Sequence, residues 1–232
     1  DAHLTGLDDP NQEILVDFLR QVDADEIYFL GDIFHFWWGR RGFRDSNYEL
    51  FLTVLEELKR AGRSMFWVRG NHDFRLGPLI EEELGVTVGD SFSAQFLGLN
   101  TLLVHGDEAD TSFGYRLTKK FLRGRAFAGL MSALGPRYAD RLGRALAGAS
   151  RHGGGKDNAL LVAQSRWAEK QFEQGVDLVV LGHSHAPGIQ KLQGGMLINL
   201  GDFADAHSFL EIEESLALRR WDAALGECHT IQ

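Results

Sequence analysis

The sequence predicts an α/β fold in which two sheets are layered between outer helices, with a helical insertion over the site. Two observations lead to this prediction. The first half of the chain alternates short apolar runs with segments of helical periodicity, whereas the tail after the last histidine pair resembles antiparallel strands. With 232 residues, the chain has room for one domain and an insertion. We expect one domain over 1–232, with the insertion at about 113–156.

Helix and strand signals define the elements of the first half. Pro10 opens a helical pattern. Ser46 is the expected N-cap of a helix that runs through Arg60, and a short helix is expected over 78–84. The predicted strands of this half are 26–30, 64–68, 86–88, 91–96 and 101–104.

The second half begins with a break in this alternation. Residues 113–150 are rich in Leu, Ala, Phe and Arg and predict two or three short helices, followed by a glycine-rich loop over 151–156. A long helix over about 157–174 then returns to the main fold. The predicted strands of this half are 177–181, 188–192, 196–200, 208–212 and 217–221.

Composition narrows the class of protein. No run approaches 18 apolar residues, so no membrane span is expected. The single cysteine, Cys228, excludes an internal disulfide framework and fits a cytoplasmic protein. The net charge of −9 is uneven, because ten basic residues and one acid between Arg116 and Lys156 give that stretch +9 and leave −18 elsewhere. We expect a local surface for an anionic partner and no broad binding of nucleic acid.

Polar blocks of Asp, Asn and His follow the apolar runs. Side chains at the carboxyl ends of buried strands point into the crevice where α/β folds place their sites. The first block has no strand before it, so we expect the native chain to begin upstream of Asp1. The blocks are Asp1-Ala2-His3, Gly31-Asp32, Gly70-Asn71-His72-Asp73, His105-Gly106-Asp107 and Gly182-His183-Ser184-His185.

These residue types predict a centre of two divalent metal ions that hydrolyses phosphate esters or anhydrides. Such a centre needs a bridging carboxylate and several neutral donors, and Asp32 is the candidate bridge. Mixed imidazole and carboxylate ligands without thiolate suit Mn, Fe, Zn or Ni better than Mg or Ca. Two Mn²⁺ ions are our expectation, with Fe, Zn or Ni as alternatives. The candidate metal ligands are Asp1, His3, Asp32, Asn71, His105, His183 and His185.

His72 has a separate predicted role beside the metal ions. It would bind phosphate as a cation or act as the acid that protonates the leaving oxygen. Asp73 would hold one nitrogen of the His72 ring and fix its tautomer. The nucleophile would be metal-activated water.

The five blocks, in this order, resemble the calcineurin-like metallophosphoesterase superfamily. The resemblance covers residues 1–185 and implies a four-layer α/β/β/α sandwich. It also implies that the first metal is held by Asp1, His3, Asp32 and His185. The second metal would be held by Asp32, Asn71, His105 and His183.

The segment 31–39 and the block 200–203 are similar to those of UDP-2,3-diacylglucosamine hydrolases, which carry an acyl-chain lid where this chain has its insertion. That family usually has Arg at the position of His72, and its lid motif and acidic pair are only partly matched here, which leaves room for a related but different substrate. The candidate substrate-binding residues are Asn71, His72, Arg75, Asp110, Ser150, Lys156 and His183.

The resemblance implies an enzyme that cleaves the diphosphate bond of UDP-2,3-diacylglucosamine, or of a close lipid or nucleotide diphosphate, to UMP and a diacylglucosamine 1-phosphate. We expect peripheral contact with the cytoplasmic face of the inner membrane, through the basic and apolar insertion. One alternative is a general metal-dependent phosphodiesterase or phosphatase with another substrate. A second is a non-catalytic scaffold, against which the intact set of ligands argues.

Overall fold

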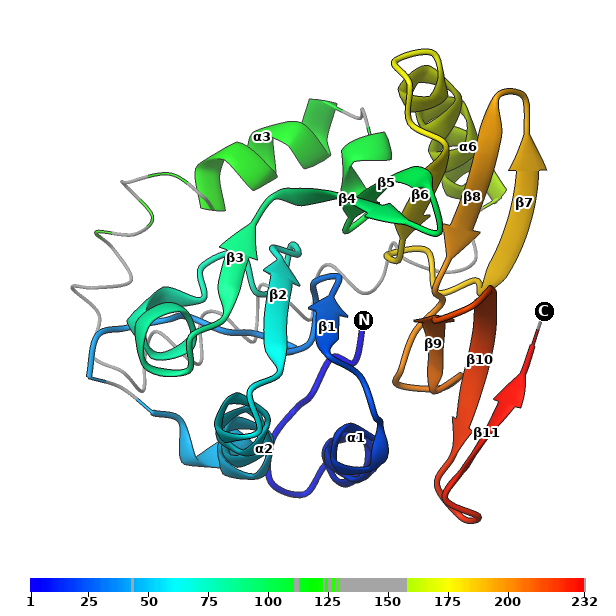
Figure 1. Ribbon diagram of the computed structural model, residues 1–232. Coiled ribbons are helices and arrows are strands. Elements are labelled where there is room, and N and C mark those ends of the chain that lie inside the picture. The colour runs from blue at the N-terminus through cyan, green and yellow to red at the C-terminus, as the bar shows by residue number, and fades with distance from the viewer. Residues whose placement is uncertain are drawn as a thin grey trace.

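The computed structural model describes residues 1–42, 44–110, 113–122, 124, 127, 129 and 158–231. Two β layers lie face to face between outer helices, which confirms the predicted α/β layering (Figure 1). The first layer holds the parallel sheet β1-β2-β3 and the antiparallel sheet β11-β10-β9, and the second is the mixed sheet β4-β5-β6-β8-β7. The strands are β1 Glu26–Phe29, β2 Ser64–Val68, β3 Thr87–Gly89, β4 Ser91–Phe96, β5 Leu99–Val104, β6 Leu178–Leu181, β7 Gly188–Leu192, β8 Gly195–Asn199, β9 Ser208–Ile212, β10 Leu216–Asp222 and β11 Glu227–Thr230.

Hydrophobic cores lie between these layers. The sequence of strand β6 shows why this strand has a core on each of its two faces. All four of its side chains are buried. Leu178 and Val180 belong to the core between the two β layers, while Val179 and Leu181 belong to the core under helix α6 (Asn158–Phe172). Since successive side chains of a strand point to opposite faces, a continuous apolar run needs cover on both sides. This pattern places β6 in the middle of the second layer.

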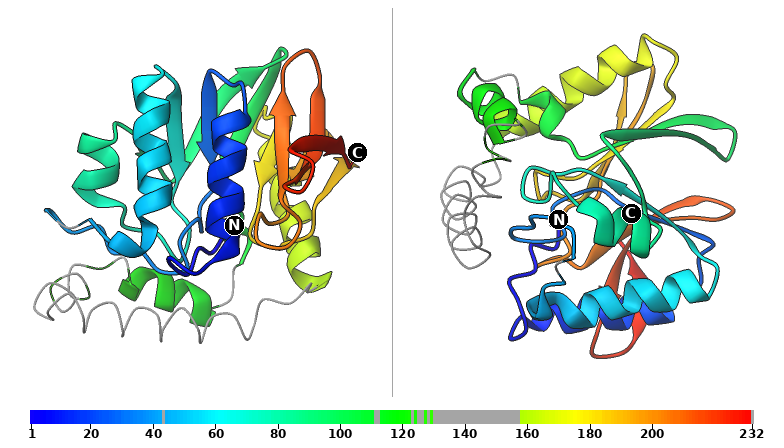
Figure 2. Two further views of the ribbon diagram at one scale, coloured as in Figure 1. Left: turned by 90° about the horizontal axis from the view of Figure 1, so that it is seen from below. Right: turned by 90° about the vertical axis from the view of Figure 1, so that its left-hand side faces the viewer.

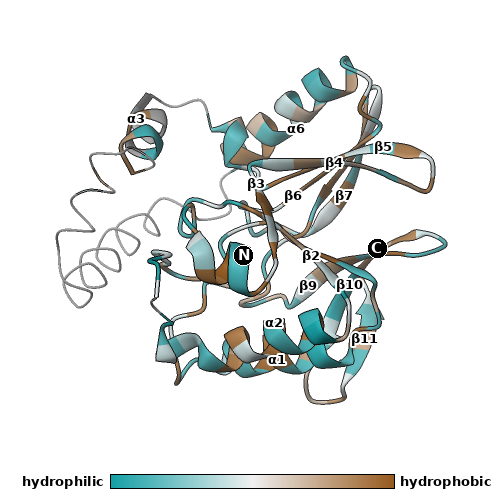
Figure 3. Ribbon diagram, turned by 60° about the vertical axis from the view of Figure 1, so that its left-hand side comes forward, coloured by the Kyte–Doolittle hydropathy of each residue, from teal (hydrophilic) through white to brown (hydrophobic). Residues whose placement is uncertain are grey.

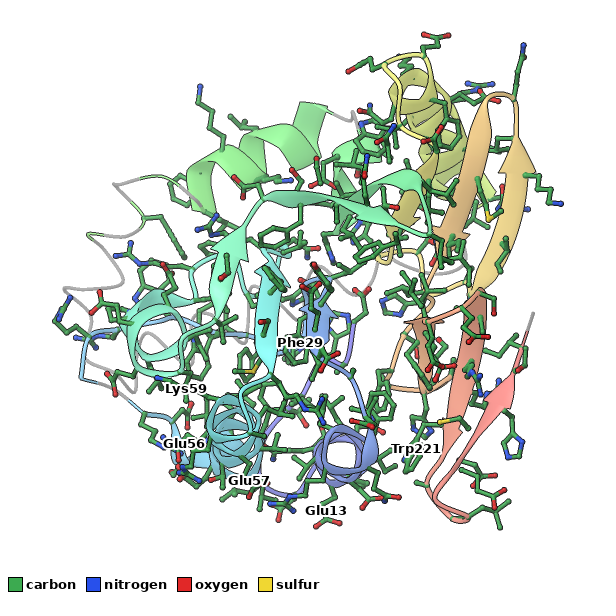
Figure 4. All side chains as sticks on the ribbon, in the orientation of Figure 1. Glu13, Phe29, Glu56, Glu57, Lys59 and Trp221 are labelled. Carbon is green, nitrogen blue, oxygen red and sulfur yellow. The ribbon has the colours of Figure 1, made fainter. Side chains whose placement is uncertain are left out.

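Helices α1 (Pro10–Gln21) and α2 (Glu49–Arg60) lie side by side on the outer face of the first layer (Figure 2). Both carry hydrophobic and hydrophilic residues along their length (Figure 3), as expected of helices that cover a sheet. The side chains of Phe29 and Trp221, labelled in Figure 4, belong to the core beneath these helices. Apolar burial on both sides of the first layer therefore holds the strands whose ends form the site.

Aspartate carboxylates cap helix α1 and the 3₁₀ turn that leads into helix α2. The Asp9 carboxylate accepts the Asn11 N–H at 3.0 Å ahead of α1, beside the predicted Pro10 start. The prediction of Ser46 as the N-cap of the second helix was wrong. Asp45 accepts the N–H of Asn47 at 3.0 Å, and residues 46–48 form a 3₁₀ turn before α2. The Asp45 carboxylate therefore caps this 3₁₀ turn, and α2 follows it with Tyr48 at the N-cap position and no side-chain cap.

The predicted helical insertion is described only in part, and one strand was not predicted. Helix α3 (Phe113–Leu122) is the described start of the predicted insertion and lies at the same end of the molecule as residue 1 (Figure 2). The other helices predicted between 123 and 150 fall almost wholly outside the described residues. Strand β11 was not predicted, because its sequence lacks apolar alternation. In the described parts of the chain, no helix is long and apolar enough to cross a membrane.

Candidate metal centre

The polar blocks meet because their strands run parallel and end at one edge. β1 and β2 deliver Asp32 and Asn71 from the first layer, while β5 and β6 deliver His105 and His183 from the second. The two layers are joined at this edge by a hydrogen bond of 2.7 Å between His105 Nδ1 and the carbonyl of Leu30. The site therefore lies at the carboxyl ends of strands from both layers, as the sequence predicts.

The first residues of the chain run beside the loop that follows β1. The N–H groups of Ala2 and His3 both donate to the carbonyl of Asp32 at 3.0 Å. Asp1 turns its side chain toward the second layer, where Oδ2 accepts the N–H of His183 at 2.8 Å. Asp1 and His183 are thus brought together although 182 residues separate them.

Four of the candidate ligands have left-handed backbone conformations. The φ angles are 49° for His3, 52° for Asp32, 68° for His183 and 50° for His185. Residues with a Cβ adopt this region at a cost of roughly 1 kcal/mol or more each, and such residues concentrate at functional sites. Side-chain direction at the site is therefore fixed against local preference, by the packing of the surrounding loops.

Two glycines let the backbone approach the carboxylates closely. A Cβ on Gly70 would collide with the Asp32 carboxylate, and a Cβ on Gly182 would collide with that of Asp1. Only glycine fits at such a contact. The glycines that precede Asn71 and His183 are therefore part of the site.

Asp1, His3 and His185 form a first group of possible metal ligands, with one ligand atom from each within 4.8 Å of the others. His3 Nε2 lies 3.4 Å from His185 Nε2, and Asp1 Oδ1 lies 3.8 Å and 3.7 Å from these two nitrogens. Burial lowers the pKa of His185 and lowers that of His3 well below its ordinary value, so both rings are neutral at neutral pH. The buried Asp1 Oδ1 has no hydrogen-bond partner among the described residues. A carboxylate oxygen facing two neutral imidazoles fits a cation.

Asp32, His105 and His183 form the second group. Burial alone would lower the pKa of His105, but the Asp32 carboxylate, 3.4 Å from His105 Nε2, together with Asp107 and Glu108 outweighs burial and raises it to about 9. Burial and the neighbouring His105 lower the pKa of His183 to about 4. Asn71 Oδ1 lies 3.1 Å from His105 Nε2. The proton on His105 balances the Asp32 charge at neutral pH, and a divalent ion in its place would do the same.

Asp32 acts on both groups. Burial would raise the pKa of its carboxyl, yet His105 and then His72 hold that pKa well below its usual range. Its charge partly offsets the lowering of the pKa by burial, both for His3 and His185 in the first group and for His183 in the second. A carboxylate that interacts electrostatically with both groups is in the position expected of a ligand shared by two metal ions. The donor set fits two divalent ions that accept imidazole and oxygen ligands.

The structure corrects the predicted contact between Asp73 and His72. The buried Asp73 carboxylate accepts the backbone N–H groups of Asp32, Gly70 and Ile33 at 3.1, 3.0 and 2.8 Å. His72 Nδ1 instead lies 2.7 Å from the carbonyl of His35. The tautomer of His72 is fixed as expected, but by the backbone carbonyl of His35. Asp73 cannot do this because its carboxylate accepts the backbone N–H groups of the neighbouring loops.

Sequence reasoning gave no role to Asp202, which the structure places behind His185. Its Oδ2 lies 3.5 Å from His185 Nδ1, and its Oδ1 accepts the N–H groups of Asp205 and Ala206 at 2.7 and 3.0 Å. A carboxylate behind a ligating histidine orients the ring and fixes its tautomer. The available signal was a Gly-Asp pair after strand β8, which has the same form as Gly31-Asp32.

The predicted substrate-binding residues are dispersed. Arg75 lies outside the metal-ligand groups, with its guanidinium 4.8 Å from the centre of the Trp38 ring. Asp110 follows a 3₁₀ turn over 107–109 and belongs to neither of these two groups of possible metal ligands. Ser150 and Lys156 lie outside the described residues.

A pocket of about 280 Å³ opens beside the loop that carries His72. The N–H of Trp37 donates to the carbonyl of His72 at 3.2 Å, and Trp38 pairs with Arg75 in a parallel bridge. These contacts tie the pocket wall to the metal-ligand loop. The pocket is lined by Trp38, Arg69, Phe74, Arg75, Asp90, Leu122 and Gly124.

Comparison with known proteins gives consistent results. A family model described as calcineurin-like phosphoesterase matches residues 1–187. A UDP-2,3-diacylglucosamine hydrolase from Pseudomonas fluorescens (strain Pf0-1) is 32% identical over 88% of this chain and 86% of its own length. Proteins of the same name from Haemophilus influenzae (strain PittGG) and Neisseria gonorrhoeae (strain ATCC 700825 / FA 1090) are each 28% identical, over 93% and 92% of both chains.

Proposed function

The chain belongs to the calcineurin-like phosphoesterase family and is a metal-dependent hydrolase, and we propose that it cleaves the diphosphate bond of UDP-2,3-diacylglucosamine. The products would be UMP and a diacylglucosamine 1-phosphate; a closely related lipid or nucleotide diphosphate fits the same proposal. The observation that carries it is one loop, on which His72 of the metal centre is followed by Phe74 and Arg75 of the pocket. Hydrolysis and recognition of the organic group are thus adjacent.

The metal ligands proposed are Asp1, His3, Asp32 and His185 for one ion and Asp32, Asn71, His105 and His183 for the other. When bound, two divalent ions polarise a phosphoryl group and lower the pKa of the attacking water. Manganese is our proposal for both, with iron, zinc and nickel as alternatives that accept the same donors. The left-handed backbone of His3, Asp32, His183 and His185 fixes the direction of these side chains before substrate arrives, and His3, Asp32 and His105 are also buried.

His72 is proposed to protonate the leaving oxygen. Because Nδ1 donates its proton to the His35 carbonyl, Nε2 is the nitrogen available for proton transfer. Nε2 lies 3.9 Å from Asp32 Oδ2, so it faces the metal centre. The oxygen of a water molecule would form a bond to phosphorus as the bond from that phosphorus to the bridging oxygen breaks. His72 Nε2 would supply a proton to the bridging oxygen that leaves, and the attacking water would release a proton to solvent. Asp73 contributes by fixing the loop that carries His72.

The pocket is proposed to receive the organic part of the substrate. Trp38 and Phe74 offer ring surfaces for a sugar, a base or an acyl chain, and Leu122 adds apolar surface from α3. Phe127 is buried against both rings, with ring centres 5.8 Å from Trp38 and 6.5 Å from Phe74. Further proposed substrate contacts are Asn71, Arg75, Asp110, Ser150, Lys156 and His183.

Helix α3 is proposed to contact the inner membrane from the cytoplasmic side. Leu117 and Phe121 expose 57% and 56% of their surface, and Lys120 is also exposed. Apolar side chains beside lysine fit the surface of an anionic bilayer. Flotation with anionic vesicles should recover the wild type, whereas Leu117→Ser/Phe121→Ser should remain below the vesicles. Equal recovery of both proteins would remove this part of the proposal.

One observation favours a second candidate function, that of a phosphodiesterase with a different organic group. The resemblance to UDP-2,3-diacylglucosamine hydrolases implies Arg at this position, whereas this chain carries His72, so the side chain that meets the leaving group differs in shape and reach. A diester needs one phosphoryl group on the metals and one acid for the leaving oxygen, and His72 suffices for that.

The test is hydrolysis of UDP-2,3-diacylglucosamine beside UDP-glucose and bis-p-nitrophenyl phosphate, with manganese supplied. Release of UMP from the lipid at a kcat/KM far above that of the other two compounds is expected. Turnover of bis-p-nitrophenyl phosphate, without turnover of the lipid or of UDP-glucose, would leave the second candidate in place.

The matched variants are His72→Ala in the site and His229→Ala on strand β11, where the side chain is half exposed. We expect the first to lose activity by roughly 100-fold or more, as for loss of a general acid, and the second to retain it. Manganese bound per chain should be the same in both variants, which separates loss of the acid from loss of the centre.

A further inference from the structure

His35 lies beside the metal centre, in a cluster of three histidines with His3 and His72. One ring nitrogen each from His3, His35 and His72 lie within 4.8 Å of one another. The ring centres of His35 and His72 are 5.6 Å apart, and those of His3 and His72 are 4.9 Å apart. His3 and His72 are buried, whereas His35 is half-buried. His35 is therefore the member of this group that a substrate reaches most easily.

The backbone holds His35 and His72 in a fixed relation. The carbonyl of His35 accepts the Nδ1 proton of His72 at 2.7 Å, and the N–H of His35 donates to the carbonyl of Leu4 at 2.9 Å. His35 follows Asp32 by three residues on the same loop. The two imidazoles thus form one wall of the metal centre, on the side of His3.

The imidazoles of His35 and His72 offer donors for a phosphoryl group of the substrate. A diphosphate carries two phosphoryl groups, and in the proposed function the metal ions bind the one that is attacked. Arg75, on the neighbouring loop, lies over the Trp38 ring and outside the three histidine and aspartate groups. Imidazole N–H groups are donors for phosphoryl oxygens. A second phosphoryl group placed beside the metal centre would meet His35.

We propose that His35 binds the phosphoryl group of the substrate that is not held by the metal ions, and so makes the enzyme prefer diphosphates over compounds with one phosphoryl group. The inference rests on the proposed function only in requiring a diphosphate substrate. It assigns His35 to substrate binding, beside the proton transfer assigned to His72.

The test compares inhibitors of bis-p-nitrophenyl phosphate hydrolysis by the manganese-loaded protein. Methylenebisphosphonate carries two phosphoryl-like groups and inorganic phosphate carries one. We expect His35→Ala to weaken inhibition by the bisphosphonate by roughly 10-fold, the effect of one lost hydrogen bond to a charged group. Inhibition by phosphate and kcat for the diester should stay within about twofold of wild type, because one phosphoryl group does not reach His35.

Two further variants sharpen the result. His35→Gln keeps an N–H donor and should recover part of the affinity for the bisphosphonate, and His229→Ala should behave as wild type. The manganese and zinc contents of His35→Ala, measured by mass spectrometry after gel filtration, should equal those of wild type. A lost ion would identify His35 as a metal ligand and overturn the proposal.

An unchanged affinity for the bisphosphonate, or an equal loss for bisphosphonate and phosphate, would also overturn it. Neither measurement uses the lipid. If UDP-2,3-diacylglucosamine is not cleaved but the bisphosphonate preference still depends on His35, then the proposed function fails and the inference about His35 stands.

Discussion

Asp73 provides the sharpest test of how the site is held, because two roles predict opposite results. If it only fixes the loops, then Asp73→Asn should destabilise the fold with or without metal. If it takes part in the reaction, the same change should abolish turnover and leave stability unchanged. The structure favours the first role, since the carboxylate accepts the N–H groups of Asp32, Ile33 and Gly70.

The size of the effect follows from these three hydrogen bonds. A hydrogen bond to a charged carboxylate contributes about 1.5–3 kcal/mol, and a buried N–H left without an acceptor costs about 1–3 kcal/mol. Asparagine keeps one acceptor oxygen and turns an NH₂ group toward at least one of the backbone N–H groups. Burial and the Asp32 charge raise the pKa of Asp73, which shows that the negative charge of Asp73 is itself unfavourable in the folded protein. Asparagine removes that charge, and this offsets part of the stability lost with the hydrogen bonds. The free energy of unfolding should fall by about 2–4 kcal/mol.

The assay is urea denaturation of the metal-free protein in chelator, followed by the same measurement with manganese. The matched control is Asp23→Asn, because Asp23 also accepts a hydrogen bond, from Arg63 at 2.7 Å, but is 93% exposed. An exposed pair contributes little, so this change should stay within about 0.5 kcal/mol of wild type. An Asp73→Asn protein as stable as this control, but without turnover, would refute the structural role.

Other changes test the metal centre. Because the pKa of His105 is raised to about 9, a metal ion must displace its proton. Manganese affinity should therefore rise about tenfold per pH unit up to about pH 9 and then level off. Calorimetry in buffers of different ionisation enthalpy measures the proton released, and release of no proton at pH 7 would contradict this prediction. Asp202→Asn should weaken binding of one ion by roughly 10–100-fold, because Asp202 lies 3.5 Å from His185 Nδ1; equal affinities by titration would exclude that support. Gly182→Ala should lower the metal content per chain, because the added methyl group meets the Asp1 carboxylate, and a full complement of metal would show that the loop can move.

The ligand residues could be predicted from the sequence because they follow a rule of sheet geometry. Asp32, Asn71, His105 and His183 each come after an apolar run, and parallel strands bring such positions to one edge. The layers were predictable for a similar reason, since the run over β6 is apolar on both faces. Periodicity and strand ends are local features, so the sequence expresses them directly.

The supporting contacts could not be predicted, because they depend on how separate loops pack. Nothing near Asp73 in the sequence indicates that its carboxylate is used by N–H groups 40 and 41 residues away. The same holds for the His35 carbonyl, which takes the place assigned to Asp73 beside His72. Which of several equivalent acceptors is used depends on backbone direction, and that is fixed only when the two loops meet.

Gln164 extends this argument from the loops to the helices. It is buried in α6, and its Nε2 lies 3.4 Å from the carbonyl of Gly106 and 3.1 Å from that of Gly182. Those glycines adjoin His105 and His183, so one side chain on α6 holds together the two loops that supply imidazoles to the second metal-ligand group. Buried amides persist only where partners satisfy them, and Asn199 completes the set by donating to Gln164 Oε1 at 3.1 Å. The placement of both histidines therefore depends on the docking of α6, an element that contributes no ligand itself.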